Sequence, residues 1–445
     1  MKFKGWGTSL AWWANINYPS DVKDKITDLI FGENGLSLNI VRYNLGGGKD
    51  PDRQEPNLRQ GGMVPCIKSG PNEEFNLQND EYQISILDKA INLGVNHVEL
   101  FVNSPPWWMT ISGKTSGSDK IATNNLKKEK IDEYADFLID SYNLMIKKYP
   151  VTSLAPFNEP SNPFWTSSGS QEGCYFDFSS RVKVIKSIKS KDPNLRMSSA
   201  DTFSSGFALF WYLFSPKKLI DQINIHGYAF SWKGYKLILD DFDIWRYLIR
   251  YMTSKPIWMS EFGMGGPDKI ENALILGRQI FRDLKTLRPE AWVYWQVIEN
   301  EYKDGWGLIQ VVFGDLRISN IKVLKQYWVM MHFTKTLKEN DTYKFINDNV
   351  LEIRNQLNNK LGYIILNDKP KIYDIDKDIL DIKSLLDCKI SDRYGNYKTE
   401  IKVPNILEPY SIMSIVYDLK DVKYNMEKEI WLDKGYLTFV MLLFF

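Results

Sequence analysis

The chain of 445 residues is too long for one small domain and suits a barrel of about 250 residues with an appended module. Its hydrophobic fraction of 44% and charged fraction of 25% are typical of a soluble globular protein. Lys and Arg number 56 against 55 Asp and Glu, which leaves a net charge of +1. No basic excess therefore points to nucleic acid or to an anionic membrane surface.

Short apolar runs alternate with longer amphipathic segments over the first 300 residues or so. Eight strands with intervening helices predict an α/β fold of the (β/α)8 TIM-barrel type. A doubly wound open sheet is the competing architecture, but it needs fewer strands and usually carries a GxGxxG turn, which is missing here. The expected strands are 3–9, 38–44, 97–103, 154–158, 196–201, 222–226, 256–261 and 291–296, and the expected helices are 20–31, 81–93, 128–148, 179–189, 235–251 and 268–286.

The pattern changes after an expected eighth helix at 320–337. Period-two alternation predicts strands at 343–356, 361–366, 379–390, 397–403 and 411–417. We therefore expect a C-terminal all-β side domain, most simply a β-sandwich. This divides the chain into a catalytic barrel at 1–340, a side domain at 341–420 and a tail at 421–445. The apolar last ten residues are too few to span a bilayer as a helix, and we expect a terminal strand or an added tail.

Cysteine and histidine are few and scattered. Three cysteines, far apart and odd in number, predict neither a disulfide framework nor a metal motif. Three histidines, equally dispersed, make a structural zinc site improbable. We therefore expect no cofactor and no metal. Residues 114–125 are rich in Ser, Gly and Lys and are expected to form a loop over the barrel mouth.

The active site of such a barrel lies at the C-terminal ends of its strands. Those ends are polar and aromatic here, and two glutamates stand out among them. Glu159 and Glu261 each close a short apolar run. Two facing carboxyls are the minimal apparatus for hydrolysing a glycosidic bond. The 15 tryptophans would supply flat rings for stacking on sugars, although most are expected to be core.

Six motifs in order resemble glycoside hydrolase family 30, and within it the endo-β-1,6-galactanase-like branch. The resemblance covers about residues 3–420 and implies a (β/α)8 barrel with a side β-domain and a retaining mechanism. The motifs are Gly5-Trp6-Gly7-Thr8-Ser9-Leu10-Ala11-Trp12-Trp13-Ala14, Arg42-Tyr43-Asn44-Leu45-Gly46-Gly47, Ser104-Pro105-Pro106-Trp107-Trp108-Met109, Asn158-Glu159-Pro160, Gln171-Glu172-Gly173-Cys174 and Ser260-Glu261-Phe262.

The resemblance implies roles for several polar residues. Glu159 would be the general acid/base and Glu261 the nucleophile, with carboxyls about 5–5.5 Å apart. Arg42 would keep Glu261 ionised through a charge-assisted hydrogen bond. Asn158 would bind the sugar 2-hydroxyl, and Tyr228 would donate to the nucleophile.

The aromatic residues are assigned in the same way. Trp108 and Trp295 would form walls of the subsite at the cleavage point. Trp12 and Trp165 are candidates for flanking subsites. Trp306, by contrast, is expected to pack where the barrel meets the side domain.

Other polar residues near the strand ends have simpler interpretations. His226 is expected to be a core histidine rather than a proton shuttle. Glu299 and Glu301 are expected to be solvated or structural. Glu172 could line the cleft or anchor a loop, and a role for Asp201 stays open.

The leading hypothesis is a retaining endo-acting hydrolase of β-1,6-linked galactan, such as arabinogalactan side chains. Alternatives are another β-linked substrate (a β-glucoside, β-glucan or xylan) or a non-catalytic carbohydrate-binding protein, against which the intact glutamate pair argues. The expected partner is a polysaccharide or oligosaccharide, with no nucleic acid, no membrane span and an open oligomeric state. The resemblance implies an extracellular location, whereas residues 1–7 hold no apolar stretch of signal-peptide length.

Overall fold

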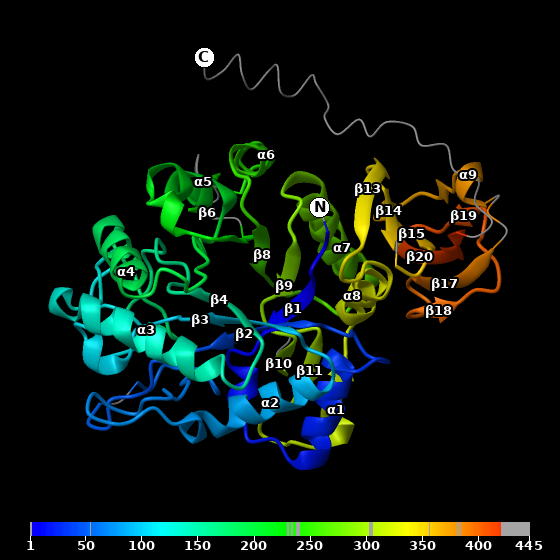
Figure 1. Cartoon of the computed structure of the whole chain (residues 1–445). Coiled ribbons are helices and arrows are strands. Elements are labelled where there is room, and N and C mark those ends of the chain that lie inside the picture. The colour runs from blue at the N-terminus through cyan, green and yellow to red at the C-terminus, as the bar shows by residue number, and fades with distance from the viewer. Residues whose placement is uncertain are drawn as a thin grey trace.

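A ring of short parallel strands forms the centre of the larger part of the molecule (Figure 1). The computed structural model describes residues 2–53, 55–228, 231–232, 235–236, 241–301, 306–355, 357–380, 382 and 384–419. Nearly every residue of the ring strands is buried, as expected for a sheet covered on both faces. The strands follow the order β4 (Val151–Ala155), β3 (His97–Phe101), β2 (Ile40–Asn44), β1 (Gly5–Ser9), β9 (Ala291–Tyr294), β8 (Ile257–Phe262) and β5 (Ile223–His226).

An eighth, irregular strand closes this ring between β4 and β5. Residues 196–202 bridge both neighbours in parallel, through Leu154 with Met197 on one side and Ser198 with Gln222 on the other. The eight strands predicted from the sequence are therefore all present. The (β/α)8 barrel is confirmed, with its fifth strand the least regular.

Eight α-helices of the described residues follow the eight barrel strands in turn. Six lie close to their predicted positions, and the seventh, predicted at 235–251, begins only at Asp243. Residues 235–236 instead form a short ribbon, β6 (Ser231–Trp232) with β7 (Tyr235–Lys236). The helices are α1 (Ser20–Phe31), α2 (Glu81–Asn92), α3 (Ile131–Met145), α4 (Phe178–Lys191), α5 (Ser205–Phe214), α6 (Asp243–Met252), α7 (Ile270–Thr286) and α8 (Lys325–Thr336).

Helix α1 shows why these segments fold where they do. Val22, Ile26 and Ile30 recur every four residues, so all three lie on one face and are fully buried against the barrel. The helix ends at Gly32, whose extended backbone (φ −65°, ψ 155°) directs the chain away. Helix α5 differs, because its sequence is apolar around most of its circumference and shows no such period. It was not predicted.

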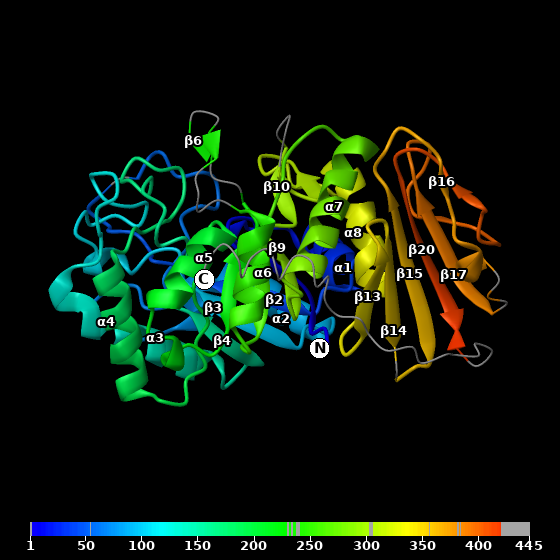
Figure 2. The same ribbon diagram turned by 90° about the horizontal axis from the view of Figure 1, so that it is seen from above.

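A six-stranded antiparallel sheet packs beside the barrel (Figure 2). One face lies on α7 and α8, and the other carries a small core with β16 (Tyr373–Asp374), β19 (Ile406–Leu407) and α9 (Lys377–Leu380). The predicted C-terminal β-domain is thus confirmed, while the division at 340/341 stays a prediction and 421–445 lies outside the described residues. The sheet order is β13 (Thr342–Asn347), β14 (Val350–Asn355), β15 (Lys360–Asn367), β20 (Ser411–Asp418), β17 (Leu385–Ser391) and β18 (Lys398–Thr399).

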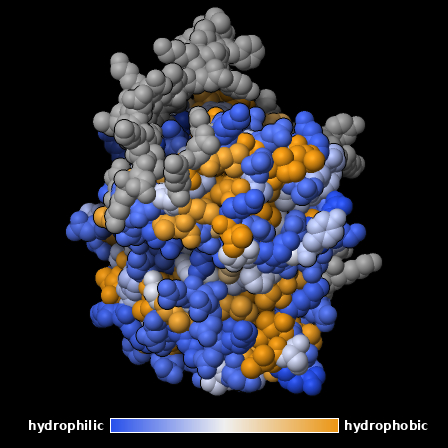
Figure 3. Space-filling model, turned by 90° about the vertical axis from the view of Figure 1, so that its right-hand side faces the viewer, coloured by the Kyte–Doolittle hydropathy of each residue, from blue (hydrophilic) through white to orange (hydrophobic). Residues whose placement is uncertain are grey.

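The outer surface of the β-domain is mixed in character. Figure 3 views the molecule from this side and shows apolar patches separated by hydrophilic side chains. Leu386 of β17 and Ile406 of β19 are among the exposed apolar residues of this domain. Within the described part of the chain, no helix has the length and apolarity needed to cross a membrane.

His332 of α8 joins the barrel to the β-domain. The imidazole is fully buried, with Nδ1 2.8 Å from the Ser414 hydroxyl of β20 and Nε2 2.9 Å from the Ser391 hydroxyl of β17. Burial lowers the pKa of His332 to about 3, so the folded protein holds the ring neutral. The contact that His332 makes between α8 and the β-domain is therefore a neutral hydrogen-bonded one.

This junction predicts acid sensitivity. An unfolded histidine binds a proton below about pH 6.5, whereas His332 in the folded state does so only near pH 3. Its contribution to stability is therefore complete above pH 6.5 and is lost as pH falls, by roughly 2 kcal/mol at pH 5. His332→Gln should show a correspondingly smaller difference between urea-unfolding free energies at pH 7 and pH 5. A difference equal to that of the wild type would contradict this.

Candidate active site

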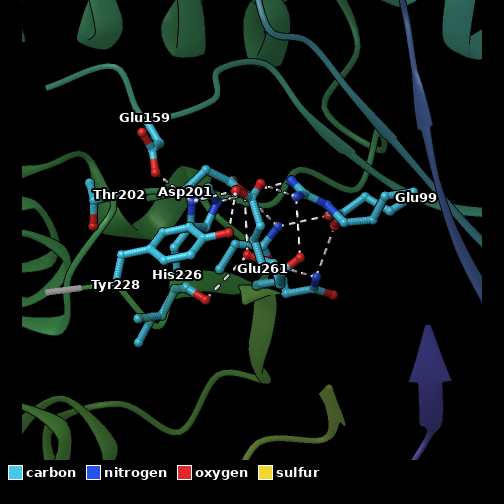
Figure 4. Close-up of polar contacts among 12 residues, drawn as sticks. Glu99, Glu159, Asp201, Thr202, His226, Tyr228 and Glu261 are labelled. Carbon is cyan, nitrogen blue, oxygen red and sulfur yellow. Dashed lines mark hydrogen bonds and ion pairs between the residues drawn. The ribbon is translucent and has the colours of Figure 1, made fainter. Parts of the chain in front are cut away.

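Glu159 and Glu261 come from two different strands and meet at the C-terminal end of the barrel (Figure 4). Glu261 lies within β8, and Glu159 follows β4 by four residues. One oxygen of each carboxyl and one nitrogen of His226 all lie within 4.8 Å of one another. The two carboxyls are therefore close enough to act on the two sides of one bond.

The backbone holds Glu159 in an unusual conformation. Its φ of 42° is in the left-handed region, and its N–H donates to the carbonyl of Asp201 over 2.7 Å. Trp165 Nε1 donates to the Glu159 carbonyl at 3.0 Å, and Asn162 Nδ2 donates to its Oε2 at 3.1 Å. Such strain persists only where the surroundings fix it, and here three hydrogen-bonding groups on two segments do so.

Arg42 of β2 is the charged centre beneath the pair. Its guanidinium is fully buried and donates to Glu99 (2.9 Å), Asp201 (2.8 Å) and Glu261 (3.4 Å). Burial opposes its charge, but these three carboxylates outweigh burial and raise the pKa of Arg42. The predicted contact with Glu261 is present, although Arg42 lies below the cleft rather than in its lining.

The pKa of Glu261 is subject to opposing influences. Burial raises its pKa to about 7, and the charge of Glu159 adds to the rise. His226 and Arg42 act in the other direction. Tyr228 also stabilises the ionised form, since its hydroxyl donates to Glu261 Oε1 at 3.2 Å. This hydrogen bond is the one that the sequence analysis assigned to Tyr228.

His226 lies between the two glutamates, at the end of β5. Its Nδ1 is 3.2 Å from Glu159 Oε1 and 3.6 Å from Glu261 Oε1, while Nε2 is 3.6 Å from Asp201. Burial opposes protonation, but Glu261, Asp201 and Glu159 together raise the pKa of His226 to about 10. The ring is buried as expected of a core histidine, yet it is also a cation shared by both carboxyls.

A cleft of about 380 Å³ opens above these groups. Asn158, Trp165, Tyr228 and Trp295 of the predicted substrate site line it. Trp12 and Trp108 do not line it, and Trp12 packs edge-on against Trp295 with ring centroids 5.7 Å apart. The lining residues are Arg59, Asn158, Glu159, Asn162, Trp165, Gln171, Phe203, Tyr228, Glu261, Trp295, Gln296, Glu299 and Trp306.

The positions of four cleft residues could not be predicted from the sequence. Arg59 and Gln171 lie on loops, where no periodic pattern indicates which way a side chain points. Trp306 is 45% exposed, and its ring centroid lies 6.1 Å from that of Tyr228, so it borders the cleft instead of packing at the domain junction. Glu299 is buried in the cleft wall rather than solvated.

The Gln171–Cys174 motif fixes the loops around the cleft. Glu172 is fully buried and accepts from Asn44 Nδ2 (3.2 Å) and from the N–H of Gly47 (3.1 Å), so it ties the loop after β4 to the end of β2. Burial raises the pKa of Glu172 to about 8. The Trp165 ring lies against Gly173, where a Cβ would come within 2.4 Å of it. Of its two predicted roles, Glu172 has the loop-anchoring one.

Glu159, His226 and Glu261 also form a donor set of the kind that binds divalent metals. Metal binding would require a neutral imidazole, whereas these carboxylates favour the protonated ring. The His226 imidazole is therefore better suited to sharing its proton with the two carboxyls than to binding a metal.

Comparison with known proteins decides the family. The model of O-glycosyl hydrolase family 30 matches residues 2–205. The chain is 30% identical over 368 residues to the endo-beta-1,6-galactanase of Hypocrea rufa, covering 76% of this chain and 72% of that enzyme. The chain belongs to glycoside hydrolase family 30. As a family 30 member it is a retaining glycoside hydrolase, which agrees with the short distance between the carboxyls.

Other similar proteins extend this picture. An exo-beta-1,6-galactobiohydrolase of Bifidobacterium longum is 23% identical over 412 residues, covering 67% of this chain but 26% of that longer protein. A conserved exported protein from Bacteroides fragilis superposes with a TM-score of 0.77 at 19% identity, over 94% of this chain and 98% of that one. The catalytic domain of the family 30 xylanase C from Talaromyces cellulolyticus gives 0.68 at 13% identity, over 94% and 97%. These two structures support the family 30 fold.

The position of His226 predicts a shift in the pH profile. His226→Gln removes the positive charge that lowers the pKa of Glu261, so that pKa should rise further. Because Glu261, as the predicted nucleophile, must be ionised to react, the acid limb of kcat/KM should move to higher pH, with a roughly 10- to 100-fold loss below it. His97→Gln, at the opposite end of a barrel strand, is the matched control. An unmoved acid limb in His226→Gln would contradict this role.

Proposed function

We propose that this family 30 enzyme hydrolyses β-1,6-linked galactan by double displacement, with Glu261 as nucleophile and Glu159 as acid/base. The observation that supports this most is the pair of carboxyls within 4.8 Å, at the base of a tryptophan-lined cleft. The substrate comes from similarity, since both named relatives act on β-1,6-linked galactose. They differ in endo or exo action, and the relative with the greater identity and coverage favours endo cleavage.

The first step forms a covalent bond between Glu261 and the sugar. A Glu261 oxygen attacks the anomeric carbon while the bond to the leaving oxygen breaks, and Glu159 gives that oxygen its proton. Tyr228 and Arg42 hold the attacking carboxylate by hydrogen bonds of 3.2 and 3.4 Å, so it has little freedom to rotate away.

The second step reverses the role of Glu159. Now ionised, Glu159 takes a proton from water, the water oxygen attacks the anomeric carbon, and the bond to Glu261 breaks. His226, 3.2 Å from Glu159 Oε1, stabilises the carboxylate form that this step needs. Two inversions at the same carbon give overall retention of configuration.

Asn158 and Trp295 are suited to hold the sugar during both steps. Asn158 is 5% exposed in the cleft wall, and its Oδ1 has no hydrogen-bond partner among the described residues. A sugar hydroxyl would supply one. Trp295 offers an indole wall that Trp12 and Phe101 support edge-on at 5.7 and 6.2 Å.

The proposed substrate predicts a product of defined stereochemistry. Incubation with β-1,6-galactan should release galacto-oligosaccharides whose anomeric proton, followed by NMR, appears first as the β form. Early α-anomer would contradict retention. Cleavage of β-glucan or xylan, with galactan left intact, would show that one of those glycans is the substrate instead. Binding of these glycans without any product would favour a carbohydrate-binding protein instead.

Substitution of each of the two glutamates should impair the enzyme in a different way. Glu261→Gln should remove turnover on every substrate, because no covalent intermediate can form. Glu159→Ala should lose about 10²- to 10⁴-fold on galactan but far less on a 4-nitrophenyl glycoside, whose leaving group needs no proton. Azide should restore turnover of the second variant and give the β-glycosyl azide. The exposed Glu301→Ala is the control, and equal losses on both substrates would contradict the assignment.

A further inference from the structure

Glu299 is a buried carboxylate in the cleft wall that the two-step mechanism does not use. It lies on β10 (Ile298–Asn300) and is 7% exposed. Its Oε1 accepts from the N–H of Asn300 at 3.1 Å, and its Oε2 accepts from Gln296 Nε2. A buried carboxylate is costly unless its oxygens are satisfied. These contacts use about two of its four acceptor positions and leave the others for another donor.

Two neighbours of Glu299 have matching hydrogen-bonding capacity. Arg59 Nη1 is 3.9 Å from Glu299 Oε2, longer than a hydrogen bond, and 36% of the Arg59 side chain is exposed. Gln296 is 1% exposed, and its Oε1 has no partner among the described residues. The three side chains all line the cleft. Together they present acceptors and donors at one wall, which is what sugar hydroxyls require.

The position of this wall identifies the part of the substrate that it would contact. Gln296 directly follows Trp295 at the end of β9, and β9 pairs with β8, which carries Glu261. Glu159, which protonates the leaving group, follows β4 and is separated from β9 by three strands in the ring. The wall therefore lies on the nucleophile side of the cleft. This is the side of the glycone, the sugar portion that becomes bonded to the enzyme.

We propose that Glu299, with Gln296 and Arg59, binds hydroxyl groups of the glycone and so determines which sugar the enzyme accepts. The carboxylate accepts from sugar hydroxyls, and the Arg59 guanidinium donates to one of them. Trp306, 45% exposed, supplies an apolar ring at the border of the same cleft. The assignment rests on the proposed function and concerns its substrate recognition.

Binding to an inactive enzyme tests this assignment without catalysis. In a Glu261→Gln background, galactose and β-1,6-galactobiose would be titrated calorimetrically with and without Glu299→Gln. This substitution keeps the shape of the side chain and removes its charge. We expect affinity to fall at least 10-fold. The matched control is Glu301→Gln, two residues along and exposed, which should leave affinity unchanged. Affinity unchanged in Glu299→Gln would overturn the assignment.

Kinetics then separates sugar binding from a purely structural role. On a 4-nitrophenyl β-glycoside the leaving group is constant, so an effect of Glu299→Gln reflects the glycone. We expect a higher KM with kcat and melting temperature nearly unchanged. A lower melting temperature with KM unchanged would show that Glu299 only ties its loop to Arg59, and would overturn the assignment.

Arg59 gives a second, pH-dependent readout. Burial raises the pKa of Glu299, and Arg59 opposes that rise. Arg59→Gln should raise the Glu299 pKa further, so that the carboxylate is lost at higher pH on acidification. KM should then begin to increase at a higher pH than in the wild type. An unshifted KM profile would contradict the pairing.

The outcomes distinguish this assignment from the proposed function. If the wild type cleaves the 4-nitrophenyl β-glucoside or β-xyloside but not the β-galactoside, the galactan proposal fails. The role of Glu299 is then judged on the glycoside that is cleaved, by the same KM comparison. If none of the three glycosides is cleaved, titration with free glucose, xylose and galactose decides the role of Glu299. If galactan is cleaved normally by Glu299→Gln, only the glycone assignment fails.

Discussion

The buried guanidinium of Arg42 is the constraint around which the barrel interior is arranged. A cation with no exposed surface is tolerated only when its donors are matched by well-placed acceptors. Three carboxylates from three different strand segments supply them here, on Glu99, Asp201 and Glu261. Glu99 in turn accepts from Ser153, Gln222 and Asn224, so the polar network continues across the barrel. Glu261, the proposed nucleophile, is positioned as one member of a group that must neutralise Arg42.

The charges in this network are not balanced in number. Arg42 and His226 face the carboxyls of Glu99, Glu159, Asp201 and Glu261. With Glu159 protonated, as the proposed first step requires, and the other groups ionised, the excess is a single negative charge. The transition state of glycoside hydrolysis has positive, oxocarbenium-like character. A preorganised site with this excess stabilises that charge as it develops.

The barrel and the two glutamates were predictable because each depends on local pattern. Short buried strands that end in Asn158-Glu159 or Ser260-Glu261 are recognisable wherever the rest of the chain goes. The limits of α1 were also predictable, since its apolar residues recur with helical spacing. Helix α5 lacked that signal, because its sequence Ser-Gly-Phe-Ala-Leu-Phe-Trp-Tyr-Leu-Phe is apolar on most sides.

The residues that complete the cleft depend on loop paths and could not be predicted. Arg59 and Glu299 are 240 positions apart in the sequence and meet only because the loops after β2 and β9 converge. From the sequence alone, Trp306 cannot be distinguished from a tryptophan that packs in a core. Only the 45% exposure of its side chain in the structure shows otherwise. His226 is buried, as expected of a core histidine, and its contacts with both glutamates could not be predicted from its place in the sequence.

The fifth strand both closes the barrel and positions Glu159, the proposed acid. The fifth strand is held by isolated bridges at Met197, Ser198 and Thr202. Between the last two, the carbonyl of Asp201 accepts the N–H of Glu159. Both residues have left-handed backbones, with φ of 47° and 42°. Local opening at this seam would release the acid while the other seven strands stay paired. Heat inactivation of this enzyme should therefore begin before its helices melt.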